Sequence, residues 1–136
     1  MRQIKGTVNR VELIGWTGDA PESRILPSGT AVVTFSVATK RPGPRNEAGE
    51  RTYATDWTNV EAWEQVAASC ARYLHKGSRV RVIGSLTTQS WEDRESGQRR
   101  YKTFVRAQEV LFLDARQESN GETLAAASEE TEEAPF

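Results

Sequence analysis

The sequence contains one cysteine, Cys70, and one histidine, His75. A single cysteine excludes a disulfide within the chain and suits the reducing cytoplasm. The same scarcity argues against a zinc site, because protein zinc sites draw mainly on several cysteine and histidine ligands. The sequence also has no glycine-rich phosphate loop, no metal-ligand spacing and no nucleophile–base set. We therefore expect no enzymatic activity, no catalytic residue, no metal and no cofactor.

Long apolar runs are missing as well. No segment approaches the roughly 20 apolar residues that a membrane-spanning helix needs. Residues 1–10 lack the apolar segment of a signal peptide. We expect a cytoplasmic protein with no membrane partner. With 136 residues and a hydrophobic content of 37%, the chain has the size of one domain with a modest core.

The net charge of −1 hides an uneven distribution of charge. Residues 1–113 hold 17 basic and 12 acidic residues, whereas residues 114–136 hold 1 basic and 7 acidic residues. The body is thus basic (+5) and the tail acidic (−6). Arginine outnumbers lysine 14 to 4, and a guanidinium group can both stack on a base and pair with a phosphate. The composition fits a protein that binds a polyanion, and it also fits an ordinary solvated surface.

Runs of β-forming residues, several of them alternating apolar and polar, predict five strands. They span residues 6–15, 31–39, 55–63, 78–91 and 101–113. In the fourth strand we expect Val80, Val82 and Leu86 to face inward, and Gly84 to mark a bulge or bend. Residues 64–74 change to helical spacing, and Gly77 is expected to terminate that helix.

Two segments between these strands are rich in turn residues and charge. Residues 40–51 contain proline, glycine and charged residues that do not suit the interior of a sheet, and residues 92–100 indicate a hairpin tip. Five strands with one helix between the third and the fourth is the order of an OB-fold barrel. We therefore expect an all-β, five-stranded OB-fold barrel over residues 1–113, and a disordered acidic tail over residues 114–136.

Four tryptophans in 136 residues are the most informative aromatic feature. Trp57 and Trp63 are six residues apart, so both project from one face of the third strand. Trp91 is expected on the outward face of the fourth strand. The same face of the third strand carries polar residues such as Glu61, whose burial without partners would be costly. Three exposed indoles among polar groups suit base stacking, which contributes about 1–3 kcal/mol per base.

Six segments, in order, resemble the bacterial single-stranded DNA-binding protein (SSB) family. They are TVNRVELIG, LPSGTAVVTFSVAT, TDWTNVEAW, YLHKGSRVRVIGSL, SGQRRYKT and the terminal EEAPF. The resemblance implies an OB-fold that assembles as a homotetramer, wraps single-stranded DNA and associates with the nucleoid. It places base-stacking aromatics at Trp57, Trp63 and Trp91, and phosphate-contacting basic residues at Arg10, Lys76 and Arg100.

The sequence departs from the family pattern in three places. The loop KRPGPRN lacks the aromatic that members often carry there, so that contact is either absent or replaced by Arg41 and Arg45. The segment TTQSW lacks the basic residues often found just before its tryptophan. Trp63 stands where many members have phenylalanine, a change that keeps or enlarges the stacking area.

The last residues combine negative charge with an apolar end. Glu132 and Glu133 precede Ala134, Pro135 and the terminal Phe136. The composition alone fits a solubilising tail, but a terminal aromatic beside acidic residues also suits an apolar pocket rimmed by basic residues. The resemblance implies that this tip docks replication, recombination and repair proteins, with glutamate in place of the more usual aspartate.

These observations predict a non-enzymatic protein that binds and protects single-stranded DNA without regard to sequence. One alternative is an RNA-binding OB protein of the cold-shock kind, although such domains are much shorter. An adaptor that works through its tail alone is a second alternative, and it leaves the tryptophans unexplained. An enzyme is the third, but His75 is the only histidine and better fits an exposed charge at a helix C-terminus.

Overall fold

The structure, a computed structural model, describes residues 4–114. Within this range six strands and one helix follow one another along the chain. They are β1 (Val11–Thr17), β2 (Glu22–Ile25), β3 (Ala31–Arg45), β4 (Arg51–Trp63), α1 (Glu64–Tyr73), β5 (Arg79–Glu92) and β6 (Arg99–Phe112). No helix among the described residues is long and apolar enough to span a membrane.

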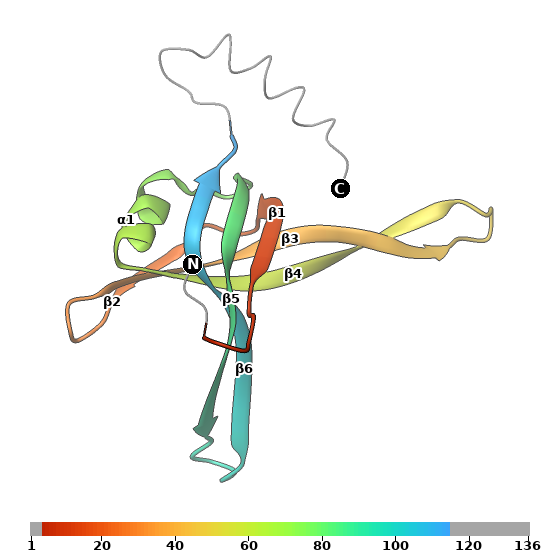
Figure 1. Ribbon diagram of the computed structural model, residues 1–136. Coiled ribbons are helices and arrows are strands. Elements are labelled where there is room, and N and C mark those ends of the chain that lie inside the picture. The colour runs from red at the N-terminus through yellow and green to blue at the C-terminus, as the bar shows by residue number, and fades with distance from the viewer. Residues whose placement is uncertain (1–3, 115–136) are drawn as a thin grey trace, which may run out of the picture.

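Five of the strands close into a barrel. They neighbour one another in the order β1-β5-β6-β4-β3, and β1 also pairs with β3, which joins the two edges. This seam is short, with Trp16 opposite Ala38 and Thr17 opposite Val37. β4 and β6 are parallel, whereas the other neighbouring strands are antiparallel. The expected OB-fold barrel is confirmed, with its helix between the third and fourth barrel strands (Figure 1).

Small branched side chains fill the barrel. The core contains six fully buried valines: Val33, Val37, Val60, Val80, Val82 and Val105. Valine suits this position because its branched side chain packs well on a pleated sheet. α1 adds Ala67 and Cys70 to the same cluster. All four tryptophans lie outside this cluster, so filling the core is not what requires them.

Gly84 lies at the expected bulge, where β5 and β6 change register. Ile83 stands opposite Glu109 and Gly84 opposite Ala107, which leaves Gln108 without a counterpart on β5. A Cβ atom on Gly84 would lie 2.2 Å from the backbone oxygen of Arg106. Only glycine permits this approach, and the bulge bends the paired strands as they leave the barrel.

Two long hairpins leave the barrel in different directions (Figure 1). β3 and β4 stay paired as far as Arg45 and Arg51, and β5 and β6 as far as Glu92 and Arg99. We call the outer parts the β3–β4 arm (residues 39–56) and the β5–β6 arm (residues 87–103). Two prolines of the 40–51 segment therefore lie in a two-stranded ribbon, where backbone groups on the outer edges face solvent and a missing N–H costs little.

Apart from the greater length of β3 and β4, the structure differs from the expected strands at three points. The sequence pattern misses β2, a short polar strand that pairs along the edge of β3. Val8, expected in the first strand, precedes β1 and is exposed. Leu86 stands opposite the buried Val105, as an inward residue should, yet it is 50% exposed. The reason is its position where β5 leaves the barrel, because few atoms remain there to cover it.

Candidate nucleic-acid interface

One face of the barrel carries the aromatic and polar residues of β4. Residues opposite each other in an antiparallel pair share a face, and so do residues two positions apart along a strand. On β4 this face holds Trp57, Asn59 and Glu61, and their partners on β3 are Ala38, Ser36 and Thr34. Trp63 follows by the same alternation. We call this surface the outer face.

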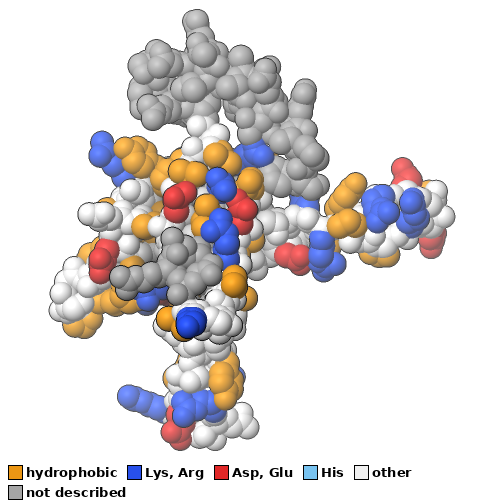
Figure 2. Space-filling model, in the orientation of Figure 1, with side chains coloured by type: hydrophobic (Ala, Val, Ile, Leu, Met, Phe, Trp, Pro, Cys, Tyr) orange, Lys and Arg blue, Asp and Glu red, His pale blue; other side chains and the backbone are white. Residues whose placement is uncertain are grey.

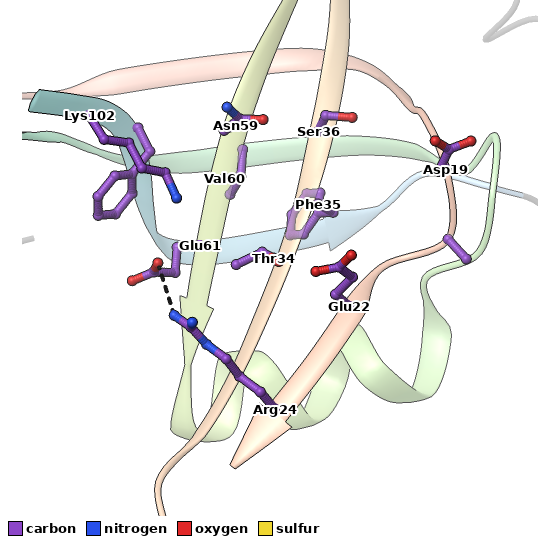
Figure 3. A pocket seen from close by; sticks show the side chains of 12 residues that line it. Asp19, Glu22, Arg24, Thr34, Phe35, Ser36, Asn59, Val60, Glu61 and Lys102 are labelled. Atoms are coloured by element: carbon purple, nitrogen blue, oxygen red, sulfur yellow. Dashed lines mark ion pairs between the residues drawn. The ribbon is translucent and has the colours of Figure 1, made fainter. Parts of the chain in front are cut away.

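A cavity of about 360 Å³ is hollowed into the outer face. Figure 3 shows the side chains that surround it. They include Asp19, Glu22, Arg24, Thr34, Ser36, Asn59, Glu61, Lys102 and Phe104. Lys102 belongs to the β5–β6 arm, whereas Asn59 and Glu61 belong to β4. The cavity therefore joins the arm to the outer face.

The outer face continues along β6, where every second residue points to the same side. These positions hold Arg100, Lys102, Phe104 and Arg106. Trp91 stands opposite Arg100 and shares its side of the arm. The structure thus brings the three predicted stacking tryptophans and Arg100 onto one continuous surface. Figure 2 shows lysine and arginine side chains on both arms.

Trp57 is 58% exposed, although it lies beside the barrel seam. Its indole rests on Gly18, where an added Cβ atom would lie 2.9 Å from Cζ3 of the ring. The Gly18 backbone N–H donates to the Ser36 carbonyl at 3.1 Å, which fixes this support against β3. The expected exposure of Trp57 is confirmed, and the absence of a side chain at Gly18 makes room for the ring.

Trp91 is 46% exposed near the tip of the β5–β6 arm. Its neighbour across the strands, Arg100, places Nε 2.9 Å from Oδ2 of Asp93. The pKa of the Asp93 carboxyl lies below its ordinary value of 3.8, first because the Glu95 backbone N–H donates to it and then because Arg100 does. Both contacts favour the ionised carboxylate. Arg100 is thus oriented by an acidic partner.

Trp63 is partly buried rather than exposed. Its Nε1–H donates to Oε1 of Glu61 at 2.6 Å, and Arg106 Cζ lies 4.3 Å from the centre of its ring. β4 passes directly into α1 after Trp63, with Glu64 at a φ of 54°. A positive φ is unusual for a residue other than glycine, and it turns the chain sharply at the point where Trp63 ends the strand.

The expectation that Glu61 would be exposed is wrong, since this residue is only 4% exposed. Burial of a carboxylate is prohibitive only when no partner is within reach. In the structure Glu61 accepts a hydrogen bond from Trp63, and Arg24 Nη2 lies 3.7 Å from its Oε2. These partners offset the cost of burying the carboxylate.

The remaining predicted basic residues are spread around the molecule. Arg41 Nε lies 2.8 Å from Asp56 Oδ2, and strand alternation places it on the side of the β3–β4 arm opposite Trp57. Arg45 donates to the Gly49 carbonyl near the tip of that arm. Arg10 is exposed just before β1, and Lys76 is exposed in the turn after α1.

Sequence reasoning missed three residues on the outer face. Lys102 and Arg106 follow Arg100 at even spacing on β6, a pattern that predicts a shared side of a strand. Tyr53, which is 63% exposed, precedes Trp57 by four positions and stands opposite Pro42. An aromatic therefore lies on the β3–β4 arm, contributed by β4 rather than by the loop KRPGPRN.

The chain is similar in sequence to known single-stranded DNA-binding proteins. The sequence model of the "Single-strand binding protein family" matches residues 8–113. "Single-stranded DNA-binding protein 1" of Chlorobaculum tepidum is 35% identical over 122 residues, which cover 90% of this chain and 75% of that protein. "Single-stranded DNA-binding protein 1" of Xylella fastidiosa is 34% identical over 114 residues, covering 84% and 83%.

A solved structure agrees with these relatives. The "Plasmodium falciparum SSB complex with ssDNA" superposes with a TM-score of 0.70 at 32% sequence identity, covering 82% of this chain and 100% of that chain. Sequence and architecture thus agree over nearly the whole of the described barrel and arms. The chain belongs to the single-strand binding protein family.

Proposed function

We propose that this chain binds single-stranded DNA largely without regard to sequence and protects it during replication, recombination and repair. The observation that carries the proposal is the outer face, on which Trp57 and Trp91 are exposed in line with basic residues of β6. Family membership supports it, because members are DNA-binding proteins and not enzymes. The similar solved structure is an SSB in complex with ssDNA.

Bases stack on the indoles of Trp57, Trp63 and Trp91 in this proposal. Every base has a π-face, so stacking is tolerant of sequence and contributes about 1–3 kcal/mol per base. Tyr53 extends the row of aromatics along the β3–β4 arm, since it lies on the same side as Trp57 and is well exposed.

Phosphates are neutralised by basic side chains on and beside the outer face. Arg100, Lys102 and Arg106 lie on the Trp91 side of β6, where a strand stacked on the tryptophans passes next to them. Further phosphate contacts come from Arg10, Arg41, Arg45 and Lys76. Each neutralised phosphate releases counterions, so binding is expected to weaken as salt rises.

Two further parts of the proposal concern other macromolecules. We propose a cytoplasmic, nucleoid-associated homotetramer, because that assembly is implied by the family resemblance. We also propose that the C-terminal tip docks replication, recombination and repair proteins. Its residues, Glu132, Glu133, Ala134, Pro135 and Phe136, lie outside the described residues, as does the tail from residue 115 onward. Sedimentation velocity tests the assembly, and pull-down with a chain truncated after residue 128 tests the tip.

Titration of tryptophan fluorescence with poly-dT tests DNA binding itself. We expect quenching that saturates, because bases stacked on indoles alter their emission. Trp16→Phe is the matched control, since Trp16 lies on β1 against Arg79 and is expected to contribute little to the quenching. Competition with poly-rU separates a DNA-binding from an RNA-binding protein. The proposal would be contradicted if poly-dT changed neither the tryptophan emission nor the electrophoretic mobility of the protein.

A further inference from the structure

A buried carboxylate lies in the middle of a surface proposed to bind a polyanion. Glu61 is 4% exposed and lines the cavity of the outer face. A negative charge there repels phosphates, and its burial costs free energy unless partners offset it. Such a residue calls for a physical reason, and its contacts supply one.

The two oxygens of Glu61 have different partners. Oε1 accepts a hydrogen bond of 2.6 Å from Nε1–H of Trp63, and Oε2 lies 3.7 Å from Nη2 of Arg24 (Figure 3 shows the second contact). The hydrogen bond joins residues two apart on β4, so it fixes the indole relative to its own strand. Arg24, on β2, anchors the carboxylate from the other side.

Arg106 completes the contacts of Trp63. It stands opposite Glu61 in the parallel β4–β6 pair, and its guanidinium lies 4.3 Å from the centre of the indole. The ring is therefore held by its N–H edge and by one face at the same time. A phenylalanine at this position has no N–H and can be held by its face alone.

We propose that Glu61 is a positioning residue, which holds the Trp63 indole in one orientation and so presents its exposed part to a base. This inference rests on the proposed single-stranded DNA binding. A side chain that is ordered before binding loses less conformational entropy when the base stacks, and the affinity rises accordingly. The carboxylate serves as a hydrogen-bond acceptor here, and Arg24 compensates its charge.

A charge-matched pair of variants tests the role. Glu61→Gln and Glu61→Met both remove the charge and keep the chain length, but only the amide oxygen of glutamine can replace the strong acceptor. Kd for a fluorescein-labelled oligo-dT is measured at one salt concentration, each variant being made in the Trp63 chain and in the Trp63→Phe chain. With Trp63 present, we expect Glu61→Met to bind about fivefold more weakly than Glu61→Gln, the factor that matches one hydrogen bond.

The Trp63→Phe chain gives the decisive comparison. Phenylalanine has no N–H, so we expect Glu61→Met and Glu61→Gln to bind oligo-dT equally in the Trp63→Phe chain. If the Kd values of Glu61→Met and Glu61→Gln still differ in this chain, the proposal is overturned. Glu61 would then act on folding or on the electrostatic potential at the DNA. Equal binding of Glu61→Met and Glu61→Gln in the chain that keeps Trp63 overturns it as well. Thermal melting of each variant confirms folding, and Glu61→Leu takes the place of Met if the Met chain does not fold.

Proton exchange at the Trp63 indole gives a readout without DNA. The Nε1–H signal is assigned by its loss in Trp63→Phe, and we expect slow exchange in the wild type and in Glu61→Gln but fast exchange in Glu61→Met. Equal exchange in all three contradicts the hydrogen bond. A wild type that does not bind oligo-dT removes the proposed function along with this role, whereas a binding wild type with equivalent variants removes only the role of Glu61.

Discussion

Trp91 stands directly opposite Arg100 on the β5–β6 arm, so an indole and a guanidinium share one side of the same two strands. One group offers a stacking surface and the other a positive charge, within one step of a nucleotide chain. The same combination recurs where Arg106 packs on Trp63. In the proposed complex, base and phosphate contacts therefore lie in pairs along the outer face, and single substitutions can separate the two contributions.

Replacement of Trp57 tests the stacking contribution. Because its ring is 58% exposed and lies outside the core cluster, we expect Trp57→Ala to weaken binding to oligo-dT by about 1–3 kcal/mol while the melting temperature changes little. Tyr73→Ala is the control, since Tyr73 is a similarly exposed aromatic on α1. Global unfolding of the Trp57 variant, seen by circular dichroism, would place this ring in the core instead.

Replacement of Lys102 tests the phosphate contribution. We expect Lys102→Gln to weaken binding at low salt and to reduce the slope of log K against log salt by about 0.7, the value for one phosphate on a single strand. The affinity should fall alike for oligo-dT and oligo-dC, because a phosphate contact carries no base information. Lys5→Gln, an exposed lysine outside the strands, is the control. An unchanged slope would mean that Lys102 does not contact the phosphates of the DNA.

The ion pair at the arm tip predicts a pH effect. Asp93 has a lowered pKa, so its ionised form is favoured in the folded chain, and the resulting stability is present above pH 3.8 and is lost as pH falls through the lower folded value. We expect the NMR titration midpoint of Asp93 to lie below 3.8, and Arg100→Gln to raise it. The rise should be partial, because the Glu95 N–H still donates to the carboxylate. A midpoint at or above 3.8 in the wild type contradicts the structure.

Gly18 predicts a change in DNA binding without a change in fold. A Cβ atom there would lie 2.9 Å from the Trp57 ring and 2.8 Å from Ser36 Oγ, so Gly18→Ala forces the indole to shift. The ring is at the surface and has room to move, and we expect a loss of affinity smaller than that of Trp57→Ala. A double-mutant cycle with Trp57→Ala checks this expectation. In the Trp57→Ala chain, Gly18→Ala should not change the affinity for oligo-dT further.

Local pattern predicts the five barrel strands and the exposure of Trp57 and Trp91. A period of two residues decides which face of a strand a side chain occupies, and it placed Trp57 and Trp91 correctly with no knowledge of their neighbours. The bulge at Gly84 is equally predictable from the sequence, because a glycine within a strand often marks a bulge. These features depend on nearby residues alone.

Features that depend on distant residues were missed. Glu61 is buried beside Arg24, and Arg106 covers the ring of Trp63; both arginines are far from β4 in the sequence. β2 has little apolar alternation and exists as a strand because β3 offers it a free edge. The position of Trp63 follows from the same long-range contacts, so its partial burial could not be derived from spacing.

The divergence of the two arms has a consequence for the shape of a bound strand. Tyr53 lies on one arm with Trp57 at its base, and Trp91 lies on the other; the arms point in different directions from the barrel (Figure 1). A nucleotide chain that touches both sets of rings must change course as it crosses the cavity between them. Its two ends then lie closer together than those of a straight strand with the same number of nucleotides, and energy transfer between dyes attached to the two ends would exceed the value for a straight strand.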